Sequence, residues 1–206
     1  MFKTLLCMVM GYSFGCINPA AALAVRKKKN LREIGTKNLG ATNAAVAFGK
    51  KYGVLVMVID ILKSFISVKL ARILFPQLYI AGLVAGSSAV MGHIFPVQMK
   101  FKGGKGLAAF GGLILAFDPM MFLMLLVIGL VLIIVTGYGT ALPLSAPMLA
   151  PLIGGWRHHS MSVFVVLLAV GCVMIYKHWE NVTAITDGTE PKAREFIQRH
   201  INKKED

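Results

Sequence analysis

The chain has 206 residues, of which 56% are hydrophobic and only 15% are charged. Soluble domains average about 45–50% apolar and about 25% charged residues, so most of this chain has no water to face. The composition excludes an ordinary soluble domain, and the length suits one bundle of membrane helices. The formal net charge of +13 is concentrated beside apolar runs, where basic clusters mark the cytoplasmic side and attract anionic lipid. We expect anionic membrane lipid, and no nucleic acid, as a partner.

Seven apolar segments are predicted to cross the membrane. A spanning helix needs about 20 apolar residues, or about 17 at the short end. Asp118-Pro119 and Gly137-Tyr138-Gly139 break the long apolar stretch in the second half of the chain. The predicted spans are residues 4–25, 53–75, 78–98, 107–117, 120–136, 141–156 and 160–176. Five spans remain the alternative if residues 107–136 form one bent or re-entrant unit.

Lysine and arginine decide the predicted orientation. The loop of residues 26–52 is the most basic, and Lys100, Lys102 and Lys105 form a second cluster two spans later. Both clusters fall inside the cell if the N-terminus lies outside and the C-terminus is cytoplasmic. We therefore predict an all-α polytopic inner-membrane protein whose basic face is cytoplasmic. It comprises a membrane domain (residues 1–188) and an amphipathic cytoplasmic tail (residues 189–206).

Residues 35–43, with the sequence Gly-Thr-Lys-Asn-Leu-Gly-Ala-Thr-Asn, are the most informative stretch. Their amides, hydroxyls and lysine cannot be buried as an apolar helix, but they can bind an anion. A small-residue run, 44–48, follows and is predicted to be helical, and a helix N-terminus favours phosphate. An ordinary capped loop remains the alternative. The candidate ligands are Thr36, Lys37, Asn38, Gly40, Thr42 and Asn43.

A second candidate loop is residues 101–106, Phe-Lys-Gly-Gly-Lys-Gly, directly before the fourth predicted span. Glycines allow a nest of backbone N–H groups, and Lys105 adds a point charge. The spacing is not that of a Walker A loop, since Gly106 stands where a magnesium-binding hydroxyl is needed. We predict that Gly103, Gly104 and Lys105 bind phosphate; a basic loop on lipid headgroups is the alternative.

The third candidate stretch, residues 176–181, ends the last predicted span. His178 and Asn181 fall on the same membrane face as the two loops, and His178 could donate to phosphate or orient a substrate. A solvated helix end is the alternative. Asp60 and Lys63 are one turn apart in the second span and can neutralise each other, or brace a polar cavity. The three cysteines and scattered histidines show no metal-site spacing, so no metal is expected.

At these stretches the sequence resembles the bacterial acyl-phosphate:glycerol-3-phosphate acyltransferase (PlsY) family. The matching motifs are residues 35–43, 49–53 with Asp60, 92–96, 101–106 and 178–181. The resemblance implies a seven-helix fold and acyl transfer from acyl phosphate to the 1-hydroxyl of glycerol 3-phosphate, giving lysophosphatidate. It implies no metal, cofactor or acyl carrier protein. It also implies catalytic roles for Thr36, Lys105 and His178, and substrate binding by the other candidates.

The chain departs from the family pattern at arginines that usually help to bind phosphate. Val46 stands where the family usually has one arginine, and others are missing near Gly137 and Ala184. Lys37 replaces a usual glycine and can restore one charge. A divergent paralogue with another acceptor or without catalysis is therefore an alternative. A small lipid-binding or transport protein is a further one, but polar motifs at a single face, without a repeat, favour an enzyme over a transporter.

Overall fold

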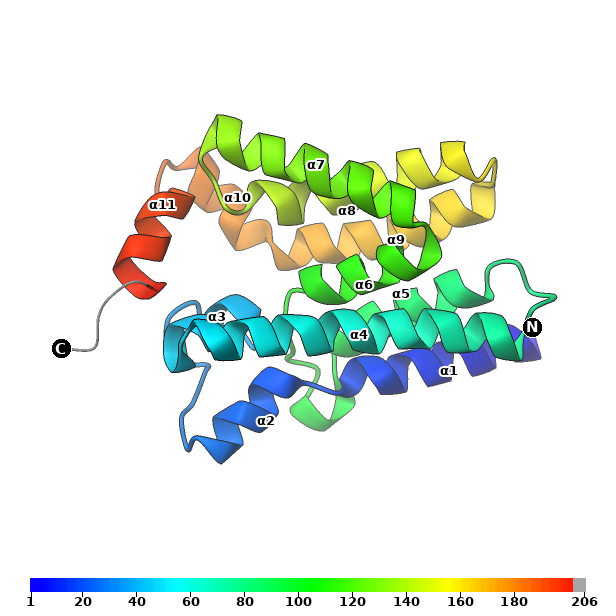
Figure 1. Ribbon diagram of the computed structural model, residues 1–206, viewed down its shortest axis with the longest axis horizontal. Coiled ribbons are helices and arrows are strands. Elements are labelled where there is room, and N and C mark those ends of the chain that lie inside the picture. The colour runs from blue at the N-terminus through cyan, green and yellow to red at the C-terminus, as the bar shows by residue number, and fades with distance from the viewer. Residues whose placement is uncertain (202–206) are drawn as a thin grey trace. The chain divides into compact units, whose positions relative to one another are not determined.

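The computed structural model describes residues 1–201, with side chains through residue 199 (Figure 1). In this part of the chain helices dominate, and an isolated antiparallel β-bridge joins Tyr138 to Lys192. The contacts divide the chain into two compact units, one comprising Met1–Pro119 and one beginning at Met120. The fold is thus all-helical, as the sequence predicts.

The first unit begins with a broken helix. Pro19 lacks an N–H and disfavours helical backbone at Asn18, so the first predicted span is divided there. The Asn18 side chain then caps the second piece by accepting the Ala21 N–H at 2.8 Å. The helices of this unit are α1 (Phe2–Cys16), α2 (Pro19–Arg26), α3 (Ala41–Phe48), α4 (Lys50–Leu74), α5 (Ala81–Ile94), the 3₁₀ turn η1 (Val97–Met99) and α6 (Leu107–Phe117).

Small residues bring the backbones of α1 and α5 into contact. A Cβ atom added to Gly11 would lie 2.0 Å from the Ala85 carbonyl oxygen, and one on Gly15 would lie 2.1 Å from that of Ala89. Such small-residue stripes allow membrane helices to approach closely. The glycines that interrupt the first apolar run are therefore packing positions.

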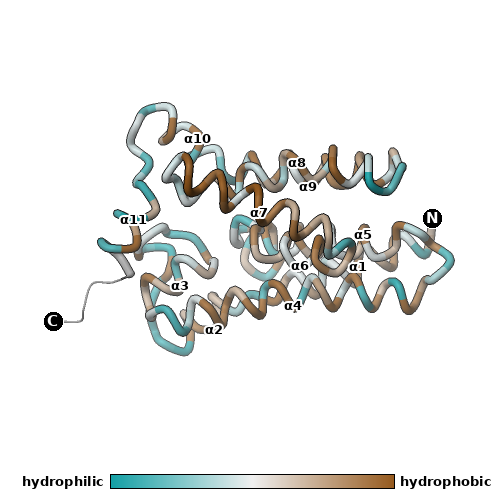
Figure 2. The backbone as a smooth tube through the Cα atoms, turned by 45° about the horizontal axis from the view of Figure 1, so that its top comes forward, coloured by the Kyte–Doolittle hydropathy of each residue, from teal (hydrophilic) through white to brown (hydrophobic). Residues whose placement is uncertain are grey.

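The second unit follows the first of the two breaks that the sequence predicts, and it contains the second. Asp118 precedes α7 (Pro119–Thr136), and the turn of residues 137–140 separates α7 from α8 (Ala141–Arg157). Figure 2 shows α7 as hydrophobic along its whole length. Gly171 packs against the Pro147 carbonyl oxygen, 2.5 Å from an added Cβ, so α9 lies close to α8. The helices are α7 (Pro119–Thr136), α8 (Ala141–Arg157), α9 (Met161–Lys177), α10 (Trp179–Thr186) and α11 (Ala193–Phe196), followed by a π-helical turn (Ile197–Ile201).

Two helical segments of the described chain are long and apolar enough to cross a membrane: Phe2–Arg26, taken through its break, and Pro119–Thr136. A third qualifies if α9 and α10, bent by 58°, form one span. Helix α4 has 25 residues but carries several charged side chains, and α8 and α9 have 17 residues each. The count of seven spans, and the orientation of the termini, stay predictions.

The predicted amphipathic tail begins with a short ordered segment. Ala193 N–H donates to the Gly137 carbonyl at 2.8 Å, and Lys192 Nζ donates to the Thr136 carbonyl at 2.7 Å. Glu195 Oε2 and Arg199 Nη2, one helical turn apart, are separated by 3.6 Å. Residues 202–206 of the predicted tail domain lie outside the described residues, and its boundary at residue 188 stays a prediction.

Candidate functional site

Asn43 organises the first candidate loop from within. Its side chain is buried; Oδ1 accepts the Thr36 N–H at 2.9 Å, and Nδ2 donates to the Leu31 carbonyl at 2.7 Å. Both ends of the amide are therefore used by the loop backbone. The buried amide thereby stabilises the loop by pairing backbone groups that would otherwise be unsatisfied, and its role as a phosphate ligand stays a prediction.

The other candidates of this loop lie at its surface. Thr36, Lys37 and Thr42 are exposed, and Asn38 and Gly40 are half-buried. Gly40 is the N-cap of α3, which begins at Ala41 and not at Ala44, so Thr42 lies in its first turn. No side chain caps this helix start. Exposed hydroxyls, one amine and free helix N–H groups together suit an anion.

The glycines of the second loop do not form the predicted nest. Gly103 N–H donates to the Ile94 carbonyl at 3.0 Å, and Gly104 N–H donates to the His93 carbonyl at 3.1 Å. The last carbonyls of α5 lack partners within their helix, and they take up these donors. In this structure the two N–H groups are thus paired within the protein, and phosphate binding by Gly103 and Gly104 stays a prediction.

Close packing is the reason for these glycines. A Cβ atom on Gly103 would lie 2.1 Å from the His93 carbonyl oxygen, and one on Gly104 would lie 2.1 Å from His93 Nε2. Lys105, half-buried, follows directly. Gly106, with φ +96°, is the N-cap of α6 and offers no side chain to the first turn. A lysine beside an uncapped helix N-terminus retains the capacity to bind an anion.

Arg32 links the basic loop of residues 26–52 to the second candidate loop. Its Nη2 atom donates to the Lys102 carbonyl oxygen at 2.8 Å, across 70 residues of sequence. In the sequence Arg32 is one of several basic residues of its loop, and nothing in the pattern distinguishes it. The structure thus adds a contact between the segment just before residues 35–43 and the loop of residues 101–106.

A buried polar cluster of Asp60, Lys63 and His93 lies beside the second loop. Lys63 Nζ is 2.8 Å from Asp60 Oδ1, which confirms the predicted ion pair. His93 Nδ1 is 3.2 Å from the same oxygen. No local pattern in the sequence relates His93 to Asp60 and Lys63, which lie at least 30 residues before it. Within the described residues, no three His, Cys, Asp or Glu side chains are grouped to hold a metal ion.

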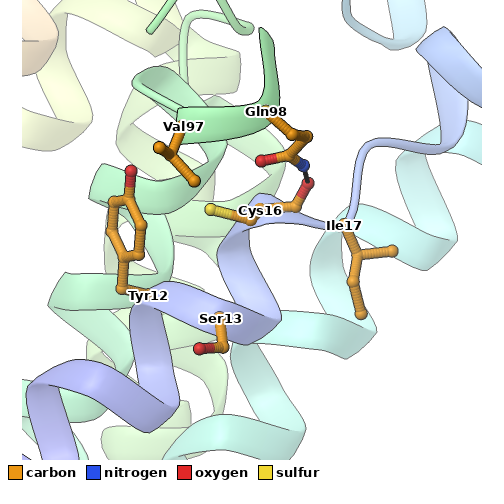
Figure 3. Close-up of a pocket in the computed structure, with 6 residues that line it drawn as sticks. All are labelled: Tyr12, Ser13, Cys16, Ile17, Val97 and Gln98. Atoms are coloured by element: carbon orange, nitrogen blue, oxygen red, sulfur yellow. Dashed lines mark hydrogen bonds between the residues drawn. The ribbon is translucent and has the colours of Figure 1, made fainter. Parts of the chain in front are cut away.

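A hollow of about 330 Å³ lies where α1 ends, as Figure 3 shows. Gln98 Nε2 donates to the Cys16 carbonyl there, and the Tyr12 hydroxyl donates to the Phe95 carbonyl at 2.7 Å. The wall is mainly apolar. The lining residues are Tyr12, Ser13, Cys16, Ile17, Val97 and Gln98.

His178 and Asn181 belong to the second unit, at the bend between α9 and α10. His178 is 4% exposed, and its Nδ1–H donates to the Met174 carbonyl at 2.8 Å. Asn181 Nδ2 lies 3.2 and 3.3 Å from the two carboxylate oxygens of Glu190. Both predicted residues therefore have contacts inside their own unit that fix their orientation, and their roles toward substrate stay predictions.

The described residues form a helical protein with two or three segments apolar enough to cross a membrane, and each of its two candidate loops carries a lysine. The sequence model of one protein family, glycerol-3-phosphate acyltransferase, matches residues 5–188 of this chain. The chain belongs to this family.

Relatives and solved structures agree with this assignment. Glycerol-3-phosphate acyltransferases of Aquifex aeolicus and Thermoanaerobacter pseudethanolicus are 33% and 31% identical, covering 91% and 89% of this chain and 98% and 92% of their own. The crystal structure of PlsY, an integral membrane glycerol 3-phosphate acyltransferase, in its glycerol 3-phosphate form is 32% identical with a TM-score of 0.84, covering 92% of this chain and 94% of that one. Its lysophosphatidic acid form has a TM-score of 0.83 at 30% identity, covering 95% and 99%.

Proposed function

We propose that the protein transfers a fatty acyl group from acyl phosphate to the 1-hydroxyl of glycerol 3-phosphate. The products are lysophosphatidate and inorganic phosphate. The observation that carries the proposal is the likeness, over 92% of the chain, to an acyltransferase structure in its glycerol 3-phosphate form. The anion-binding features of both loops support it, because donor and acceptor each carry a phosphate group.

The reaction needs positioning and electrostatics more than a strong protein base. The glycerol oxygen attacks the acyl carbonyl carbon, an ester C–O bond forms, and the C–O bond to the phosphate breaks. The phosphate of the acyl phosphate leaves with the electron pair of the broken bond. The hydroxyl proton passes to an oxygen of a substrate phosphate. Holding two phosphates in register makes the attack effectively intramolecular, and cations stabilise the developing charge.

The residues divide between these tasks. Lys105 and the start of α6 bind one phosphate, and Thr36, Thr42 and the start of α3 bind the other. Asn38 and Gly40 shape the turn before α3. For His178 and Asn181 the motif alone supports a role toward substrate; with its Nδ1–H donated to the Met174 carbonyl, His178 has Nε2 to offer.

The finer localisation is part of the same proposal. We propose a bacterial inner-membrane protein with seven spans, the N-terminus outside and the active face cytoplasmic. Arg26, Lys27, Lys28 and Lys29 are exposed, and they suit anionic lipid headgroups at that face.

Lys37 is proposed to replace the charge that Val46 lacks. An added Cβ on Gly35 would lie 2.9 Å from Val46 Cγ1, so the turn that carries Lys37 packs on Val46. The ammonium group can thus reach a phosphate near the position of the usual arginine, though as a point charge and not as a bidentate fork. Wild-type affinity for glycerol 3-phosphate in a Lys37→Ala variant would contradict this.

Phosphate release from palmitoyl phosphate in the presence of glycerol 3-phosphate tests the proposed function. Purified protein in detergent or a lipid mesophase should release phosphate only when both substrates are present, and Lys105→Ala should abolish release. Release with another acyl acceptor but not with glycerol 3-phosphate would indicate a divergent paralogue. No release above the Lys105→Ala level would reject the enzyme and favour a lipid-binding protein.

A further inference from the structure

The cluster of Asp60, Lys63 and His93 has no part in the acyl transfer chemistry, although it is built from ionisable groups. The three side chains are 1%, 4% and 3% exposed. Ionisable groups inside membrane helices are costly and mark functional positions. A buried ion pair is also weak evidence for stability alone, because desolvation offsets its attraction. The cluster therefore calls for a role beyond holding helices together.

The hydrogen-bonding geometry fixes the direction of the His93 ring. The Lys63 ammonium has three protons, and its three oxygen partners are the Gly15 carbonyl at 3.0 Å, the Ile17 carbonyl at 2.7 Å and Asp60 Oδ1 at 2.8 Å. His93 Nδ1 lies 2.9 Å from Lys63 Nζ and 3.2 Å from the same Asp60 oxygen. It can accept a proton from the lysine or donate one to the carboxylate, so in either tautomer this edge of the ring is held by the ion pair.

The opposite edge of the ring faces the second loop. A Cβ atom on Gly104 would lie 2.1 Å from His93 Nε2 and 2.9 Å from Cε1. The Gly104 N–H also donates to the His93 carbonyl. His93 thus holds Gly104 through both its backbone and its side chain, and Lys105 is the next residue.

We propose that Asp60, Lys63 and His93 are positioning residues that set the place of Lys105. The cluster connects the break between α1 and α2 to helices α4 and α5, and through the His93 ring to the loop. A shift at any of these members moves the loop. This inference rests on the proposed function, in which Lys105 binds a substrate phosphate.

A double-mutant cycle between His93 and Gly104 tests the proposal. His93→Asn keeps a donor for Asp60 but removes the ring edge, and we expect kcat/KM for glycerol 3-phosphate to fall by about 10- to 100-fold, mainly through KM. Gly104→Ala should cause a loss of similar size by collision with the ring. In the double variant the new methyl group occupies the vacated space, so its kcat/KM should stay within about threefold of that of His93→Asn.

Arg72 provides a matched control on the same helix. Its guanidinium group donates to two carbonyl oxygens at the end of α6. The distances are 3.2 Å to the Ala116 oxygen and 2.9 Å to the Phe117 oxygen. Arg72→Met should lower the melting temperature while leaving KM near the wild-type value. Losses that multiply in the double variant, or a KM increase in Arg72→Met equal to that in His93→Asn, would overturn the proposal.

A readout that does not depend on activity separates this inference from the proposed function. Trypsin should cleave after Lys102 and Lys105 several-fold faster in His93→Asn than in the wild type, and no faster in Arg72→Met. If the wild type releases no phosphate, the proposed function fails, and the cleavage rates still decide whether the cluster holds the loop. Equal rates in all three proteins would refute it.

Discussion

Replacing Gly103 with alanine should displace the lysine-bearing loop. The added Cβ would lie 2.1 Å from the His93 carbonyl oxygen and 2.6 Å from Pro96 Cδ, whereas ordinary contact begins at 3.4 Å. Relief requires a movement of roughly 1.3 Å, the difference between 3.4 and 2.1 Å. The nearest obstacle is backbone, so the loop itself must move, and its 3.0 Å bond to the Ile94 carbonyl is strained.

The expected cost follows from that movement. Overpacking of this kind destabilises by about 1–3 kcal/mol, and misplacing a binding group by about 1 Å can reduce the rate about 100-fold. Phosphate release and thermal unfolding in the same detergent measure the two effects. Gly139→Ala is the matched control, because its Cβ would lie 3.7 Å from the nearest atom, Ala193 Cβ. Wild-type kcat/KM and melting temperature in Gly103→Ala would refute the role given to this close contact.

Three further substitutions test other parts of the first unit. Asn43→Ala leaves the Thr36 N–H and the Leu31 carbonyl without their side-chain partner. We therefore expect the unfolding free energy to fall by about 2–4 kcal/mol and activity to be lost. An unchanged melting temperature would contradict this expectation. Lys37 has φ +55°, so Lys37→Gly should stabilise by about 1 kcal/mol while raising KM for glycerol 3-phosphate; a lower melting temperature would argue against backbone strain there. The buried Ser64 Oγ has no hydrogen-bond partner among the described residues, so Ser64→Ala should raise the unfolding free energy by about 1 kcal/mol, and destabilisation would reveal an unrecognised partner.

Local patterns predict the helices and the regions of the candidate loops well. The break at Asp118-Pro119, the glycine turn at residue 137 and the ion pair of Asp60 with Lys63 depend on neighbours in sequence, and the structure has all three. The family motifs are likewise local, and they predict residues 35–43 and 101–106 as the candidate phosphate-binding loops.

What each residue does in those loops depends on partners far away in sequence. The sequence predicts phosphate binding by Asn43, and only the structure shows that its amide pairs with the backbone of Leu31 and Thr36. The sequence predicts a nest of N–H groups at Gly103 and Gly104, and only the structure shows that these groups pair with the end of α5. A sequence shows that a hydrogen-bond donor exists, but not which acceptor the fold places within hydrogen-bonding distance of it.

The sequence by itself determined that this is a helical membrane protein of the glycerol-3-phosphate acyltransferase family, and it predicted a basic face for phosphate, because hydropathy and short motifs are properties of contiguous residues. Only the tertiary structure decided that Arg32 contacts the loop of residues 101–106 and that His93 stands between the Asp60–Lys63 pair and Gly104. These contacts arise from helices α1, α4 and α5 packing together. The physical reason is that buried polar groups must find partners wherever packing places them, and packing is not encoded at any single position.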